Sequence, residues 1–215
     1  MSKIAVFFHC IISDGERPID KDYALNLIAS QMTALQDSGL SDACHYLCVG
    51  VNGDEVDSAA VSMLCPKKAD IVTHGKTART EITTLNLIQR WLPEHRGWNV
   101  LYHHTKGVST PNQADGWRRR MERHCVWNWQ ECLKLLDNGF EAVGCHWLTP
   151  EGHGSSIGSP FFGGTFWWAK ADYLLTLPPL PEPIWANRYE AETWIGKGPR
   201  RPRVKDLYPG WPSVS

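Results

Sequence analysis

The chain has 215 residues, of which 42% are hydrophobic and 21% charged. This composition is that of a globular protein and excludes a disordered chain, and the length suits one domain with at most a small appendage. Lys plus Arg is 22 and Asp plus Glu is 23, so the net charge is −1. This excludes the strongly positive net charge that is typical of a protein that binds nucleic acid over its whole surface. No apolar run approaches the roughly 20 residues of a membrane span.

Apolar runs and helical spacings of apolar residues alternate along the chain, which predicts an α/β fold with a mostly parallel sheet flanked by helices in a single domain. Residues 165–173 read as an aromatic strand or a strand–helix junction, and residues 188–196 as the start of a helix. The strands are expected at 3–12, 44–51, 69–73, 98–103 and 141–145, and the helices at 23–37, 81–92 and 116–137.

The 11 Trp and seven Cys residues are the unusual features of the composition. Trp suits a core and also a surface on which sugars or bases stack. The odd number of Cys, without the spacing of a small disulfide scaffold, predicts reduced thiols in a cytoplasmic protein.

Parallel α/β sheets bind ligands at the carboxyl ends of their strands, so loops 9–14, 103–109 and 152–164 are expected to face one crevice. These loops lack the glycine-rich nucleotide fingerprints, and the chain lacks HExxH, CxxC and GxSxG motifs. His103 and His104 resemble a ligand pair, but neighbours on a strand point to opposite faces, so packed or hydrogen-bonded histidines are the stronger interpretation.

Six segments occur in a recognisable order: KIAVFFHCI, LYHHTKGVS, WRRRME, VGCHW, FFGGTFWWAKADYLLTLP and RYEAETWIG. Over roughly residues 3–196 the chain thereby resembles small bacterial and viral glycosyltransferases, and the HTKG and FWWA segments are the most specific. The chain departs from the family at Thr165, where the G-N-F-W-W form has Asn. The resemblance implies a GT-A-like fold that binds a nucleotide-sugar donor.

The resemblance also implies where the donor diphosphate lies. GT-A enzymes usually place a metal-binding Asp-x-Asp where this chain has His103, His104 and Thr105, followed by Lys106 and Gly107. Lys106 can neutralise the diphosphate directly, so no cofactor is expected beyond the donor and no metal site, with His104 as the ligand if a metal binds. The predicted donor-binding residues are His9, Cys10, His104, Thr105, Lys106, Gly107 and Arg188. A surface lysine in a turn is the alternative for Lys106.

Glu192 matches the late Glu of the family and is the predicted general base, with Glu190 in reserve. A base there implies direct displacement with inversion at the anomeric carbon. The alternative is that both carboxylates complement a helix dipole.

The acceptor side is predicted from aromatic, basic and glycine residues near the same crevice: Trp117, Arg118, Gly163, Gly164, Trp167 and Trp168. If residues 167 and 168 lie on a strand, one ring faces the core and the other the crevice, where it could hold a sugar. Loop 152–164 is either a lid over the donor or an ordinary surface loop.

Residues 197–215 are interpreted as an irregular basic tail after a domain of residues 1–196. Arg200, Arg201, Arg203 and Lys205 either form a solvated tail or contact a polyanionic acceptor, such as hydroxymethylated viral DNA or the pyrophosphate of a lipid carrier of a surface glycan precursor.

Two other functions stay open. A metal-dependent hydrolase would need a cluster drawn from His103, His104, His124, Cys145 and His146. A non-catalytic module that binds nucleic acid or glycan would use the Trp residues and the basic tail. Lys106 and Glu192 together favour the transferase, because a binding module needs no carboxylate in its crevice.

Overall fold

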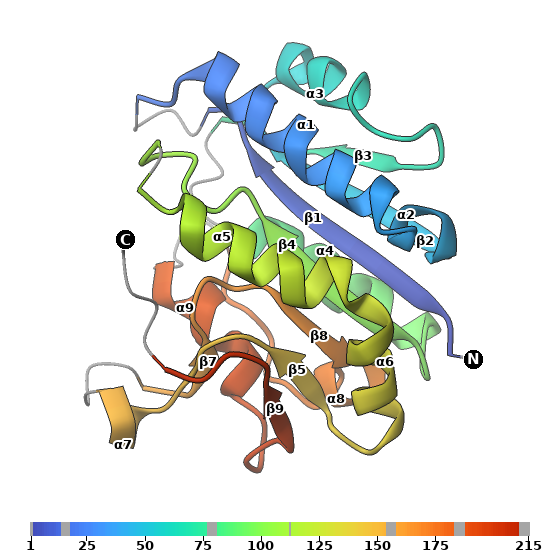
Figure 1. Ribbon diagram of the computed structural model, residues 1–215, viewed down its shortest axis with the longest axis vertical. Coiled ribbons are helices and arrows are strands. Elements are labelled where there is room, and N and C mark those ends of the chain that lie inside the picture. The colour runs from blue at the N-terminus through green and yellow to red at the C-terminus, as the bar shows by residue number, and fades with distance from the viewer. Residues whose placement is uncertain are drawn as a thin grey trace.

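The computed structural model describes residues 2–13, 18–76, 81–111, 113–153, 158–182 and 188–210, with the backbone alone for residues 152, 153 and 188. A seven-stranded sheet in the order β3-β2-β1-β4-β8-β5-β9 forms its centre (Figure 1). The strands are β1 (Ile4–Ile11), β2 (Tyr46–Asn52), β3 (Asp70–Thr73), β4 (Asn99–His104), β5 (Ala142–Gly144), β8 (Trp167–Lys170) and β9 (Val204–Asp206).

Helices cover both faces of this sheet (Figure 1). The helices are α1 (Lys21–Asp37), α2 (Leu40–Ala43), α3 (Glu55–Ser62), α4 (Ile82–Trp91), α5 (Asp115–Glu122), α6 (Trp129–Asp137), α7 (Pro150–His153), α8 (Ala171–Leu174) and α9 (Arg188–Thr193). Apolar residues of α1, α5 and α6 pack in one core, and those of α4, α8 and α9 pack in a second core on the opposite face. A separate two-stranded ribbon pairs β6 (Trp147–Leu148) with β7 (Phe161–Phe162).

The strand directions confirm the predicted mostly parallel sheet. Strands β1, β2, β3 and β4 run parallel, β8 runs antiparallel between β4 and β5, and β5 runs parallel to β9. All eight residues of β1 are buried, as expected of a central strand covered on both faces. Phe8 and Cys10 enter one core, whereas Phe7 enters the other.

The helix expected at 116–137 is divided into α5, a π-helical turn (Arg123–Trp127) and α6. The Trp168 indole N–H donates to the Cys125 carbonyl oxygen within this turn, at 2.8 Å. A side chain that enters the backbone ladder of a helix is a known cause of such interruptions. The amphipathic pattern of the sequence continues through the turn, so it does not reveal the break.

The two Trp residues of β8 are both buried, which corrects the expectation that one ring faces the crevice. Trp167 is 1% exposed and Trp168 is 0% exposed. The rings do point to opposite faces of the sheet, but each face carries a hydrophobic core, Trp168 in the first and Trp167 in the second. Strand alternation was predicted correctly, and the layer of helices on each face was not taken into account.

The segment predicted to be an irregular tail contributes strand β9 to the sheet. Val204, Lys205 and Asp206 pair with Ala142, Val143 and Gly144 of β5. The Leu207 backbone N–H extends the pairing by donating to the Gly144 carbonyl at 2.7 Å. None of the described helices has the length and apolar character needed to cross a membrane.

Replacing Trp168 with Ala is expected to lower the free energy of unfolding by about 3–5 kcal/mol, because it leaves a cavity in a packed core. Trp127 is 46% exposed, so Trp127→Ala is the control and should change stability by less than about 1 kcal/mol. Urea unfolding at neutral pH measures both. If the two variants lost the same free energy of unfolding, this description of the core would be contradicted.

Candidate active site

The carboxyl ends of the parallel strands meet at one edge of the molecule, where the segments that follow β1 and β4 lie next to each other. His9 is paired in register with His104 on the neighbouring strand. The Thr105 backbone N–H donates to the His9 carbonyl at 3.0 Å, and the Ile11 N–H donates to Thr105 Oγ1 at 3.2 Å. The Thr105 hydroxyl therefore fastens the two strand ends together.

His104 forms a buried ion pair that was not predicted. Its Nδ1 lies 2.7 Å from Glu81 Oε1, and its Nε2 lies 3.0 Å from the Gly164 carbonyl oxygen. Tyr102 donates to the other carboxylate oxygen of Glu81 at 3.2 Å. A carboxylate and a carbonyl only accept hydrogen bonds, so both nitrogens of His104 carry protons and the ring is an imidazolium.

The charge of His104 also determines the protonation of Glu81. Burial by itself raises the pKa of Glu81, but the attraction of His104 and of more distant His9 and Lys106 outweighs it and lowers the pKa to about 2. Glu81 is therefore a carboxylate at neutral pH. It lies just before α4, and in the sequence nothing distinguishes it from an ordinary charged residue at the start of a helix.

The residues at the end of β4 do not fit a divalent cation in the place of the usual Asp-x-Asp. Both nitrogens of His104 already have partners, and His103 points to the opposite face, where its ring stacks on Phe8 with centroids 4.3 Å apart. The described residues contain no group of three or more His, Cys, Asp or Glu side chains that could hold a metal.

Lys106 begins the turn after β4 and lies against α5. Its Nζ is 4.0 Å from the centroid of the Trp117 ring, a cation–π contact. Gly107 adopts a positive φ of 89°, which favours glycine, and a Cβ there would come within 2.9 Å of Ala114 Cβ. The turn therefore folds back onto the start of α5 and presents the ammonium group on an aromatic face.

Arg118 holds the same turn in place. Its Nη1 donates to the Lys106 carbonyl at 3.3 Å and to Asp115 Oδ1 at 2.7 Å, and its Nε lies 3.5 Å from Glu122 Oε1. Burial raises the pKa of Glu122 to about 7 even though Arg118 opposes the shift. Arg118, which was predicted on the acceptor side, is 6% exposed, and its guanidinium binds groups of the protein itself.

His9 and Cys10, both predicted to bind the donor, lie on opposite faces of β1. The Thr84 hydroxyl bridges His9 Nδ1 at 2.8 Å and His74 Nε2 at 3.0 Å. Burial lowers the pKa of His9 to about 3, so the ring is neutral. Cys10 is fully buried in the core on the other side, and burial raises the pKa of its thiol. Cys10 is therefore a core residue.

Gly163 and Gly164 bring the predicted acceptor loop to the same place. The Gly163 backbone N–H donates to the His146 carbonyl at 2.8 Å. Gly164 has a φ of 88°, and a Cβ there would come within 2.9 Å of Trp117 Nε1. Glycine at this position is what allows the loop to reach both His104 and Trp117. Residues 154–157 of the predicted lid 152–164 lie outside the described residues.

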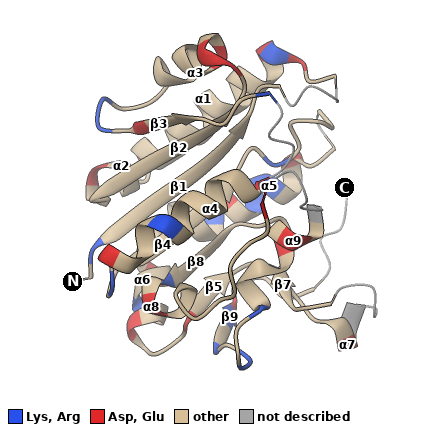
Figure 2. Cartoon of the chain, turned by 180° about the vertical axis from the view of Figure 1, so that it is seen from behind, with Lys and Arg blue, Asp and Glu red and all other residues tan. Residues whose placement is uncertain are grey.

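Helix α9 carries Glu190, Glu192 and the backbone of Arg188. It packs against α4 and β7, and it lies at the same side of the molecule as the start of α5 (Figures 1 and 2). Both glutamates are partly buried. The side chain of Arg188 is outside the described part of the structure, so its predicted contact with the donor is not addressed.

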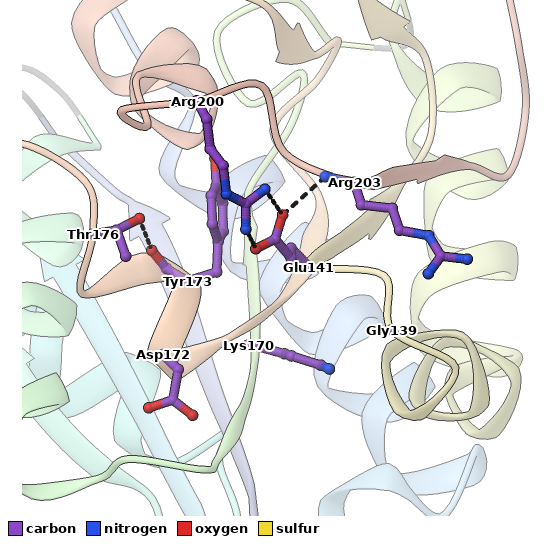
Figure 3. Close-up of a pocket in the computed structure, with 8 residues that line it drawn as sticks. All are labelled: Gly139, Glu141, Lys170, Asp172, Tyr173, Thr176, Arg200 and Arg203. Atoms are coloured by element: carbon purple, nitrogen blue, oxygen red, sulfur yellow. Dashed lines mark hydrogen bonds and ion pairs between the residues drawn. The ribbon is translucent and has the colours of Figure 1, made fainter.

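The basic residues of the C-terminal segment lie at the opposite edge of the sheet. Arg200 and the backbone N–H of Arg203 both bind the Glu141 carboxylate, in a hollow of about 390 Å³ (Figure 3). Lys170 also lines this hollow, and it is paired with Asn99 at the amino end of β4. Arg201 is exposed and Arg203 packs on Phe140. This edge is far from the Lys106 turn.

Removal of the Glu81 carboxylate is expected to cost about 3–5 kcal/mol of stability at pH 7, because Glu81→Ala leaves a buried imidazolium without its counter-charge. The folded-state pKa of about 2 lies below the ordinary value of 4.5, so the contribution is complete above about 4.5 and is lost as the pH falls through about 2. Urea unfolding from pH 7 to pH 2 measures the difference.

The exposed Glu131, whose side chain is 60% exposed in a pair with Lys134, supplies the control Glu131→Ala. It should change stability by less than about 1 kcal/mol at every pH. A Glu81→Ala variant as stable as this control at pH 7 would contradict the assignment of a charged pair.

Comparisons with known proteins agree with this fold. A proposed nucleotide-diphospho-sugar transferase from Desulfovibrio desulfuricans G20 is similar with a TM-score of 0.51 and 12% identity, over 97% of this chain and 81% of that one. Two structures have lower scores: a 4-diphosphocytidyl-2C-methyl-D-erythritol synthase (0.44, 13% identity, 96% of this chain and 89% of that one) and Rv0371c from Mycobacterium tuberculosis H37Rv (0.48, 12% identity, 98% and 90%).

At 12% identity, the first likeness shows the fold alone, an α/β architecture of the nucleotide-diphospho-sugar transferase type. No curated protein sequence matches the chain. The family described as "Domain of unknown function (DUF8361)" matches residues 7–182. Because this match spans most of the sequence, the chain belongs to the DUF8361 family.

Proposed function

We propose that this protein is a glycosyltransferase that moves a sugar from a nucleotide-sugar donor to a hydroxyl acceptor. The observation that carries the proposal is the place of Lys106. The strand order runs outward from β1 to β2 and β3 on one side and to β4 on the other, so β1 and β4 flank the switch point of the sheet. Ligands of open α/β sheets bind outside this point, and Lys106 lies there, two residues after the end of β4.

The electrostatics of the turn suit a diphosphate. His104 and Lys106 place two cationic side chains at the end of β4, and Glu81 pairs with the first of them. The Trp117 ring fixes the Lys106 ammonium, which reduces the entropy lost when a phosphate binds. A lysine that is held in this way can stabilise the leaving diphosphate in the role that a metal has in many sugar transferases.

Two parts of the proposal come from the sequence. Glu192, with Glu190 in reserve, is the sequence-derived candidate for the base, and a base acting on the acceptor hydroxyl in one displacement gives inversion. The free Cys residues suit a cytoplasmic protein. The basic residues Arg200, Arg201, Arg203 and Lys205 lie at the edge of the sheet away from Lys106. A polyanionic acceptor that used them, such as hydroxymethylated viral DNA, would therefore contact that edge.

Thermal-shift titration with UDP, GDP, CDP and dTDP, each with Mn²⁺ and with EDTA, tests donor binding. We expect one nucleotide to raise the melting temperature by mass action and to do so equally in EDTA, because Lys106 supplies the positive charge. Lys106→Ala should abolish the shift. Lys170→Ala changes a lysine that is paired with Asn99 at the amino end of β4, the opposite end of that strand from Lys106, and should keep the shift.

A shift that appears only with Mn²⁺ would contradict the metal-independent form of the proposal while leaving a nucleotide site. An absence of any shift in the wild-type protein would contradict the proposed function. A shift that survives in Lys106→Ala would remove Lys106 from the donor site.

A further inference from the structure

The hollow around Glu141 is a second place where a ligand can bind, away from the proposed donor site (Figure 3). Its volume of about 390 Å³ lies within the range of pockets that take small molecules, roughly 300–1,000 Å³. Its described lining includes three basic and two acidic side chains: Lys170, Arg200, Arg203, Glu141 and Asp172. The partners of these charges decide which kind of ligand the hollow can hold.

The Glu141 carboxylate is fully used by the protein itself. It accepts from the Arg200 guanidinium through both oxygens, and Oε2 also accepts from the Arg203 backbone N–H at 2.9 Å. Burial raises the pKa of Glu141, but these hydrogen bonds outweigh it and lower the pKa, so the group is ionised at neutral pH. Glu141 and Arg200 therefore neutralise each other.

Asp172, the second carboxylate, is turned away from the Lys170 ammonium (Figure 3). Its Oδ2 accepts from the Gly97 backbone N–H at 3.2 Å, and its Oδ1 lies 3.8 Å from Arg96 Nη1. Its side chain is 54% exposed, so solvent and salt screen its charge. Asp172 thus pairs with a neighbouring turn and not with the basic groups of the hollow.

Two of the three basic groups have no such partner. Within the described part of the chain, neither the Lys170 ammonium nor the Arg203 guanidinium takes part in a hydrogen bond or a close ion pair. Lys170 interacts with Glu141 only at longer range. The Arg203 guanidinium lies 4.7 Å from the centroid of the Phe140 ring, a cation–π contact that leaves its N–H groups free. Both side chains can therefore donate to a ligand.

The fold fixes where these two groups lie. The Lys170 backbone N–H donates to the Glu141 carbonyl at 3.0 Å, and the Glu141 N–H donates to the Arg203 carbonyl at 2.8 Å, so the three backbones lie side by side. Gly139 has a φ of 93°, and a Cβ there would come within 2.9 Å of Arg203 Nη1. Glycine leaves room for the guanidinium, and in Figure 3 both basic side chains extend to the Gly139 side of the hollow.

We propose that the hollow binds a phosphate group between the Lys170 ammonium and the Arg203 guanidinium. A guanidinium donates to two oxygens through its planar fork, and an ammonium is a point charge with three donors. Lys170 ends β8 and Arg203 precedes β9, so their donors reach a ligand from different directions. Phosphate oxygens point in several directions, whereas the two oxygens of a carboxylate lie in one plane, so a phosphate fits both groups at once.

Arg200 has a different part in this site. Its ion pair neutralises Glu141, a carboxylate that would otherwise repel a phosphate in the same hollow. Lys170 lies at the opposite end of β4 from the Lys106 turn, because it is paired with Asn99. The site is therefore separate from the donor site, and the inference goes beyond the proposed function without resting on it.

Thermal-shift titration with sodium phosphate at constant ionic strength tests the site. It uses the Lys106→Ala variant, which lacks the cation of the proposed diphosphate site, so that binding there does not contribute. We expect phosphate to raise the melting temperature of this variant by mass action. A further Lys170→Ala or Arg203→Gln change should raise the apparent Kd for phosphate by about tenfold or more, because each removes a charged donor. The melting temperature without phosphate shows that each variant is folded.

The matched control is Lys67→Ala. Lys67 is an exposed lysine that precedes β3, at the other edge of the sheet from β9. Its removal should leave the Kd within about twofold, because a distant surface charge is screened. Arg203→Lys, which keeps the charge and loses the planar fork, should weaken binding less than Arg203→Gln.

Three ligands identify what is bound. Tighter binding of glycerol 3-phosphate than of inorganic phosphate would assign the site to a phosphate ester, and the reverse would assign it to the free ion. Either result supports a phosphate site. Sodium acetate that binds as tightly as phosphate would overturn the phosphate assignment, and so would a phosphate shift that is unchanged by Lys170→Ala and Arg203→Gln.

A second measurement locates the bound group. In ¹⁵N-labelled Lys106→Ala protein, phosphate should move the Gly139 amide and Arg203 Nε signals, while the Gly107 amide and Arg118 Nε signals at the other site stay in place. A response confined to Gly107 and Arg118, or no response from any of the four, would overturn the inference. Neither result bears on the proposed function, which nucleotide binding by the wild-type protein tests separately.

Discussion

The ion pair between Glu81 and His104 is the interaction on which the geometry of this site depends. It joins the residue before α4, the end of β4 and, through the Gly164 carbonyl, the loop that precedes β8. A buried pair is stable only in close geometry, because the desolvation of both charges must be offset. Lys106 follows His104 by two residues, so the pair fixes the point from which the Lys106 turn starts.

The pair also changes the charge of the strand end. An Asp-x-Asp at this place carries negative charge and needs a cation before it can attract a diphosphate. Here the imidazolium of His104 is paired with Glu81, and the Lys106 ammonium lies on the Trp117 ring. The end of the strand therefore carries cationic side chains where the usual motif carries two carboxylates.

The strands could be predicted because buried parallel strands consist of continuous apolar runs. The roles of Lys106, Trp117 and Gly164 stay predictions, and the structure brings the three residues next to one another. Glu81 could not be predicted, since its role arises from a contact with His104 across 23 residues of sequence. Trp167 and Trp168 were placed wrongly because alternation gives the face of a side chain and not what covers that face.

The C-terminal segment shows how composition can direct attention to the wrong residues. Its arginines suggested a polyanion, yet Arg200 is committed to Glu141 at the far edge of the sheet. The residues of this segment that contact His146 are acidic or neutral: Asp206 accepts from the backbone N–H of His146, and the Gly210 carbonyl lies 2.7 Å from its Nδ1. Asp206 ends β9 and Gly210 follows it, so pairing of β9 with β5 lets the segment support the left-handed His146 turn. The His146 carbonyl in turn accepts from the Gly163 N–H, so the C-terminal segment also supports the loop that precedes β8.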